Sequence, residues 1–111
     1  MLEDTTRANL LYDFYSSLLT GRQREILELY YQHDLSLAEI ADNTGISRQA
    51  VHDVVKRAVR ALEKAEERLG LAARFAAQEK DLRRLQQLLS GKTLTEEQRL
   101  EALQIVERLL E

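Results

Sequence analysis

The stretch that decides the fold runs from Leu37 to Lys56 and reads LAEIADNTGISRQAVHDVVK. Within it, a short helical segment, a turn containing Gly45 and a second helical segment follow one another, which is the pattern of a helix-turn-helix. Gly45 permits the tight turn because glycine adopts left-handed backbone conformations at little cost, and Ala41 is small enough for two helices to cross closely. The stretch predicts a helix-turn-helix. The alternative is a helical corner with no role in binding.

Helix starts on both sides of this stretch are marked by capping-box patterns, in which Ser or Thr precedes Glu or Gln by three residues. The three patterns are Thr20 with Gln23, Ser36 with Glu39, and Thr95 with Gln98. Apolar residues at helical spacing follow each pattern, and the chain contains no proline. We therefore expect an all-α fold, with helices over about 4–19, 20–32, 37–43, 48 to a stop at Gly70, 71–89, and 95 to near the C-terminus.

Two mostly apolar seams with alternating steps of four and three continue beyond the helix-turn-helix. The first comprises Val51, Val55, Ala58, Leu62, Ala65 and Leu69, and the second comprises Leu71, Phe75, Gln78, Leu82, Leu85 and Leu89. Such seams usually pack against another helix, so we expect a homodimer built on the long helices, with a folded-back monomer as the alternative. The expected organisation is a helix-turn-helix head running into a long helix over residues 1–69, and a C-terminal helical part over residues 70–111 for dimerisation or partner binding.

Positive charge is concentrated on the second helix of the motif, although the chain carries a formal net charge of −3. Residues 1–47 have three basic and eight acidic side chains, residues 48–70 have six and four, and residues 71–111 have seven of each. Because nonspecific binding to nucleic acid draws on many phosphate contacts by Lys and Arg, this distribution points to the second helix as the binding element.

Six polar side chains avoid the apolar side of that helix and are the candidate nucleic-acid contacts: Arg48, Gln49, His52, Lys56, Arg57 and Arg60. Arg and Gln at the start of the helix can read base edges, whereas Lys56, Arg57 and Arg60 suit phosphate contacts. The alternative is an ordinary solvated helix face, which Asp53 in the midst of these residues favours.

Aromatic residues crowd the first two expected helices, at Tyr12, Tyr15, Tyr30 and Tyr31. They could stack on RNA bases. Aromatic side chains at helical spacing beside other apolar residues are more often part of a core, so we expect core packing.

The composition excludes several classes of protein. Without cysteine there is no disulfide framework, thiolate metal site or thiol nucleophile. Gly-rich phosphate loops and nucleophile motifs are missing, and neither His33 nor His52 has a set of partners at metal-ligand spacing. We expect no enzymatic activity, cofactor or metal. No apolar run approaches the roughly 18 residues that span a bilayer, and the first eleven residues are charged where a secretory signal is apolar, so we expect a cytoplasmic protein without membrane insertion.

Several stretches of the sequence, taken together, resemble known families of proteins. The segments LLTGRQREILELYY (18–31), LAEIA (37–41) and ISRQAV (46–51) resemble region four of bacterial sigma factors. With YDFY (12–15) and SRQAVHD (47–53) added, the chain is similar to the YlxM family of helix-turn-helix proteins over about residues 11–69.

That resemblance implies a protein encoded beside the genes of the signal recognition particle that takes part in, or regulates, this targeting pathway. The expected function is therefore a regulatory protein that binds DNA or RNA, with a component of the particle as a further partner. The alternative is a protein adaptor that binds the particle's GTPase without contacting nucleic acid.

Overall fold

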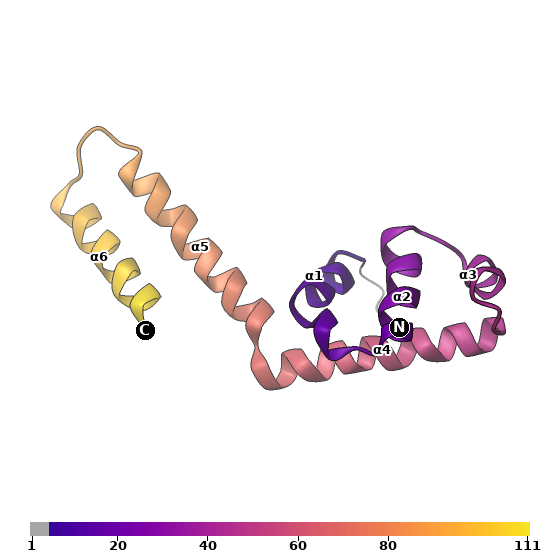
Figure 1. The fold of residues 1–111 in the computed structure, drawn as a ribbon. Coiled ribbons are helices and arrows are strands. Elements are labelled where there is room, and N and C mark those ends of the chain that lie inside the picture. Colours follow the sequence, from indigo (N-terminus) through magenta and orange to yellow (C-terminus); the bar gives the residue numbers. More distant parts are fainter. Residues whose placement is uncertain (1–4) are drawn as a thin grey trace. The chain divides into compact units, whose positions relative to one another are not determined.

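The computed structural model describes residues 5–111, and these residues form helices and connecting turns with no strand among them (Figure 1). The fold is all-α, as predicted. The order is α1 (Thr5–Tyr15), the 3-10 turn η1 (Ser16–Leu18), α2 (Gly21–Leu27), the π-helical turn η2 (Glu28–Gln32), α3 (Leu37–Thr44), α4 (Arg48–Leu69), α5 (Leu71–Leu89) and α6 (Glu96–Leu110). The chain divides into two compact units, Met1–Ala72 and Ala73–Glu111.

The predicted capping boxes start three of the helices. At α2, the Thr20 hydroxyl accepts a hydrogen bond from the Gln23 backbone N–H at 3.2 Å, and the Gln23 side chain accepts one from the Thr20 N–H at 3.0 Å. The same pair of bonds precedes α3 and α6. At α3, the hydrogen bond donated by the backbone of Ser36 lowers the pKa of the Glu39 carboxyl. Local sequence therefore fixes where these helices begin.

The first two helices are less regular than the sequence predicts. The expected helix over 4–19 ends at Tyr15 and tightens into η1, and its expected first position, residue 4, lies outside the described residues. The expected helix over 20–32 ends at Gln32 but widens into η2. The wider turn brings Leu29, Tyr30 and Tyr31 into partial burial against the core, although they are consecutive in sequence. Packing of adjacent large side chains thus overrides the regular helical period.

The apolar side of α4 forms the centre of the first unit. Val51, Val55, Ala58 and Leu62 are buried, and α1, α2 and α3 all contact α4. Three helices of the same chain thus cover the seam from Val51 to Leu69, so this seam is not free to build the homodimer that the sequence predicts on the long helices. Only Leu69, at the end of this seam, is largely exposed.

The turn between α3 and α4 has the predicted geometry. Gly45 has φ 75° and lies in the left-handed region, and its N–H donates to the Ala41 carbonyl at 2.9 Å. Ser47 caps α4, since its hydroxyl accepts from the Ala50 N–H at 3.0 Å. The turn therefore fixes where α3 ends and where α4 begins.

We expect Gly45→Val to lower the free energy of unfolding by about 1 kcal/mol or more, since a β-branched residue is strained at positive φ. A Cβ at Gly45 would meet no atom within 4 Å, so the strain comes from the backbone alone. Urea denaturation followed by circular dichroism measures the change. Gly21→Ala is the control, because its Cβ also enters open space and its φ is not in the positive region. Equal stability of both variants would contradict the assigned turn.

The end of α4 is also fixed by specific contacts. Gly70 adopts the left-handed conformation, with φ 62°, and ends the helix as predicted. The Tyr15 hydroxyl donates to the Glu66 carboxylate at 2.6 Å, and the backbone N–H groups of Leu71 and Ala72 donate to the Tyr15 hydroxyl and to Glu66, each at 2.9 Å. Burial, followed by the bond to Glu66, raises the pKa of Tyr15. These bonds satisfy the first N–H groups of α5 within the first unit.

The second unit is a hairpin of two antiparallel helices, α6 and the part of α5 after Ala72. Leu88 and Ile105 are buried between them. Arg108 donates to Asp81 at 2.8 Å, and Arg84 donates to Glu101 at 2.6 Å. The hydrogen bond from Arg108 lowers the pKa of the Asp81 carboxyl. Neither helix, nor any other in the described chain, is long and apolar enough to cross a membrane.

Candidate nucleic-acid interface

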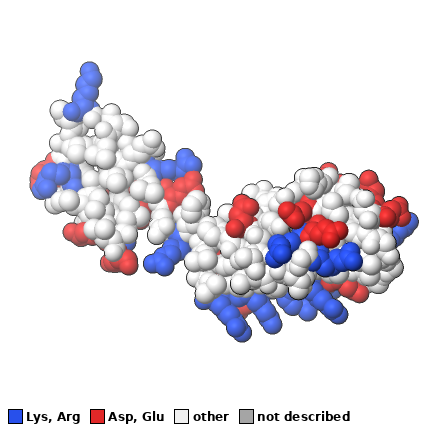
Figure 2. Space-filling model, viewed as in Figure 1, with Lys and Arg blue, Asp and Glu red and all other residues white. Residues whose placement is uncertain are grey.

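The candidate interface is the outer face of α4, opposite the side that packs in the core. Of the six residues predicted from sequence, Arg48, Gln49, Lys56, Arg57 and Arg60 are exposed, and His52 is half-buried. Gln49, Lys56, Arg57 and Arg60 thus lie away from the buried side, whereas Arg48 and His52 lie at its border, seven residues before the buried Val55 and Val59. In Figure 2, Lys and Arg side chains project in a row from the lower edge of the unit that contains α4.

Arg48 and Gln49 lie in the first turn of α4, directly after the Ser47 cap. In helix-turn-helix proteins the first residues of the second helix contact base edges. The arrangement therefore suits groove contacts by these two side chains.

Asp53 already engages two of the predicted residues. The Gln49 side-chain amide donates to the Asp53 carboxylate at 3.1 Å, and His52 Nδ1 lies 4.0 Å from the same oxygen. A base that Gln49 reads must replace this exposed, neutral hydrogen bond, which contributes little to stability. Asp53 also orients Gln49 toward the outer face, so its presence does not remove the residue from the interface.

Three cations gather further along the helix. Lys56, Arg57 and Arg60, together with Asp53, line a shallow hollow of about 220 Å³. Guanidinium and ammonium groups around such a hollow can bind the oxygens of a phosphate. The structure therefore brings together the three residues that the sequence assigns to phosphate contacts.

The sequence analysis missed two further cations, Lys64 and Arg68, which continue the same face at steps of four residues from Arg60. Both are exposed. Two of the three acidic residues between Arg60 and Arg68 bind elsewhere: Arg7 donates to both oxygens of Glu63, at 3.0 and 2.8 Å, and Tyr15 donates to Glu66. The third, Glu67, is exposed and lies seven residues after Arg60, on the same face. The spacing of four residues from Arg60 to Lys64 and from Lys64 to Arg68 is the sequence signal that could have identified them.

We call the five cations Lys56, Arg57, Arg60, Lys64 and Arg68 the α4 ridge. It extends for about 18 Å at a helical rise of 1.5 Å per residue. A row of this length can follow several successive phosphates of one strand.

The tyrosines do not contribute to this face. Tyr15 is buried in the core, and Tyr12, Tyr30 and Tyr31 pack against it. The Tyr30 and Tyr31 rings meet edge to face with centroids 4.9 Å apart. The prediction of core packing is confirmed. In the described part of the chain, no three His, Asp or Glu residues form a group that could hold a metal ion.

Comparison with known proteins agrees with this architecture. Residues 2–104 match the model of the UPF0122 family, described as "Putative helix-turn-helix protein, YlxM / p13 like". UPF0122 proteins of Bacillus cereus (strain AH187), Bacillus anthracis (strain A0248) and Bacillus thuringiensis subsp. konkukian (strain 97-27) are each 45% identical to the chain over 109 residues. These alignments cover 98% of the chain and 99% of each relative.

Proposed function

The chain belongs to the UPF0122 family of YlxM- and p13-like helix-turn-helix proteins, and we propose that it is a regulatory protein that binds nucleic acid through the outer face of α4. The observation that carries this proposal is the hollow lined by Lys56, Arg57 and Arg60 on the helix that follows the helix-turn-helix turn. In this account those residues and the rest of the α4 ridge contact phosphates, while Arg48, Gln49 and His52 contact bases.

The resemblance to YlxM proteins is the basis for the pathway that we propose for this regulator. We infer that it takes part in signal recognition particle targeting, in the cytoplasm, with DNA or the particle's RNA as its ligand. The role is one of binding and needs no cofactor. The ridge is compatible with either nucleic acid, because phosphate contacts carry no sequence information.

A second candidate function is that of an adaptor for the particle's GTPase, and one observation favours it. A groove of about 400 Å³ lies beside the ridge and is lined by Leu18, Ala61, Ala65 and Leu69, with Lys64 and Arg68 at its edge. Leu18 is 64% exposed and Leu69 58%. Such an apolar groove with a basic edge suits an amphipathic helix that carries acidic residues.

Co-purification with the full-length tagged chain distinguishes the two functions. If the chain binds nucleic acid, RNA or DNA elutes with the parent, and a variant with Arg48, Lys56 and Arg60 changed to alanine elutes without it. Nuclease treatment before elution then removes any protein that was held through the nucleic acid.

A different outcome of the same experiment would support the adaptor. Recovery of the GTPase from nuclease-treated parent and variant alike, together with no nucleic acid in either untreated sample, would replace the proposed function by the adaptor. Circular dichroism of the variant confirms that it is folded.

A further inference from the structure

The hairpin of α5 and α6 carries large apolar side chains that its own two helices leave exposed. On α5 after Ala72 these are Phe75, Leu82 and Leu89, and on α6 they are Leu100, Leu103, Val106 and Leu110, with exposed fractions between 38% and 81%. Leu82 and Leu89 are seven residues apart, as are Leu103 and Leu110, so each pair forms a stripe along its helix.

The α5 stripe and Val106 of α6 lie on the same face of the hairpin. The residues that face the other helix are Asp81 and Leu88 on α5, and Ile105 on α6. Leu82, Leu89 and Val106 each directly follow one of these three residues in the sequence. A step of one residue turns the side chain by about 100° around the helix axis, always in the same sense along the chain. In two antiparallel helices packed side by side, equal rotations away from the contact lead to the same face. Leu103 and Leu110 lie further round α6, about 160° and 140° from Ile105 in that sense, so they extend this surface onto the outer side of α6. We call the surface formed by Leu82, Leu89, Leu103, Val106 and Leu110 the apolar face.

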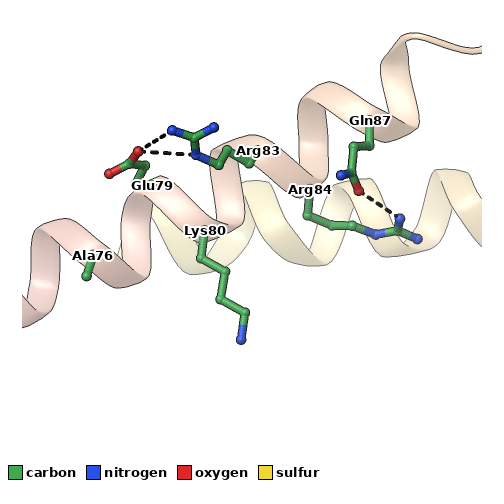
Figure 3. Close-up of a pocket in the computed structure, with 6 residues that line it drawn as sticks. All are labelled: Ala76, Glu79, Lys80, Arg83, Arg84 and Gln87. Carbon is green, nitrogen blue, oxygen red and sulfur yellow. Dashed lines mark hydrogen bonds and ion pairs between the residues drawn. The ribbon is translucent and has the colours of Figure 1, made fainter.

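The opposite face of the hairpin is mostly polar, with the exposed Leu100 of α6 at its outer edge. The residues one position before the contact residues are Lys80, Gln87 and Gln104. Figure 3 shows this side of α5, where Arg83 pairs with Glu79 at 2.6 Å and Arg84 donates to Gln87 at 3.4 Å. In the hollow of about 470 Å³ between these side chains, Glu79, Arg83 and Arg84 form ion pairs within the chain. The hairpin is therefore amphipathic as a whole.

A hairpin of this size is too small to be stable with one face uncovered. Leu88 and Ile105 are the large side chains that it buries among its described residues. Units below about 40 residues usually need disulfides, metals or association to be stable, and this chain has no cysteine.

Charge and area both favour a second copy as the partner that covers the apolar face. Residues 73–111 hold seven basic and seven acidic side chains, so two copies do not repel each other, and neither an acidic nor a basic partner is favoured. Five large apolar side chains from each copy bury on the order of 1,000 Å² in total, the area at which specific interfaces begin.

We propose that the apolar face binds the apolar face of a second copy, which closes a four-helix bundle and forms a two-fold homodimer. The interface is the C-terminal hairpin and not the α4 seam. The dimer presents two α4 faces, and the proposal holds whether or not those faces bind nucleic acid.

Sedimentation equilibrium of the full chain tests the proposal. The parent is a dimer at tens of micromolar, and Leu82→Glu with Leu103→Glu raises the dissociation constant at least about 100-fold, because the dimer would bury four unpaired carboxylates. Leu18→Glu is the control, since Leu18 is similarly exposed but lies in the first unit. A monomeric parent, an unaffected double variant or dissociation by Leu18→Glu would each overturn the proposal.

Cross-linking gives a second readout that does not depend on weakening the dimer. Because the chain has no cysteine, Gln78→Cys and Gln87→Cys each introduce a single thiol. Gln78 lies four residues before Leu82 on the side of the apolar face, and Gln87 lies on the polar face shown in Figure 3. A short bismaleimide should cross-link the first variant at least about ten times more efficiently than the second. Equal yields would overturn the assigned face even if the parent is a dimer.

Discussion

Changing Lys56, Arg57 and Arg60 to glutamine is expected to weaken binding to nucleic acid by about 100-fold at low salt, since two or three charge-assisted phosphate contacts are lost together. The three residues are exposed and line one hollow, so their removal does not alter the core. Fluorescence anisotropy with labelled duplex DNA and with labelled RNA measures the change.

A variant with Lys80, Arg83 and Lys92 changed to glutamine is the matched control. It also removes three positive charges, but from exposed positions of the second unit. If general attraction to the protein's cations caused binding, both variants would weaken it equally, and the α4 face would have no special role.

Leu62→Ala is expected to lower the free energy of unfolding by about 2–5 kcal/mol, the range for removal of a large buried side chain. Leu62 is 1% exposed and belongs to the core cluster with Tyr15 and Val59. Since small domains are stable by only about 5–15 kcal/mol, this is the largest single effect that we expect on stability. Urea denaturation followed by circular dichroism measures it.

Leu69→Ala is the control for Leu62→Ala, because it removes the same atoms one helical heptad later from a side chain that is 58% exposed. We expect a change of about 0.5 kcal/mol or less. Equal costs at Leu62 and Leu69 would show that α1, α2 and α3 do not cover the α4 seam.

The features of the fold that the sequence predicts correctly are those with local causes. Capping boxes at Thr20, Ser36 and Thr95 depend on residues three positions apart, and the stops at Gly45 and Gly70 depend on the conformational freedom of one residue. Such features can be read from a short window of sequence.

Features that depend on distant residues were not predictable in the same way. The seam from Val51 to Leu69 shows which side of α4 is buried, but periodicity does not show whether the covering helices belong to the same chain. The widened turn at Glu28–Gln32 also arises from packing, since Tyr30 and Tyr31 both approach the core.

In the candidate site too, features with local causes were predictable from sequence and contacts between distant residues were not. Gln49, Lys56, Arg57 and Arg60 could be chosen from sequence because helical spacing separates them from the buried valines, whereas Arg48 and His52 lie seven residues before Val55 and Val59. Lys64 and Arg68 were missed because the pairing of Glu63 with Arg7 joins residues 56 positions apart, and only the folded chain shows that this acid is engaged away from the ridge.

The salt dependence of binding tests the central claim most directly. For the parent and for the variant with Lys56, Arg57 and Arg60 changed to glutamine, the affinity for duplex DNA is measured between about 50 and 200 mM salt, and its logarithm is plotted against the logarithm of the salt concentration. Each phosphate contact contributes about 0.9 to the slope, so the account predicts a slope that is flatter by about 2.7 in the variant. Parallel lines for the two proteins would contradict phosphate binding by the α4 face.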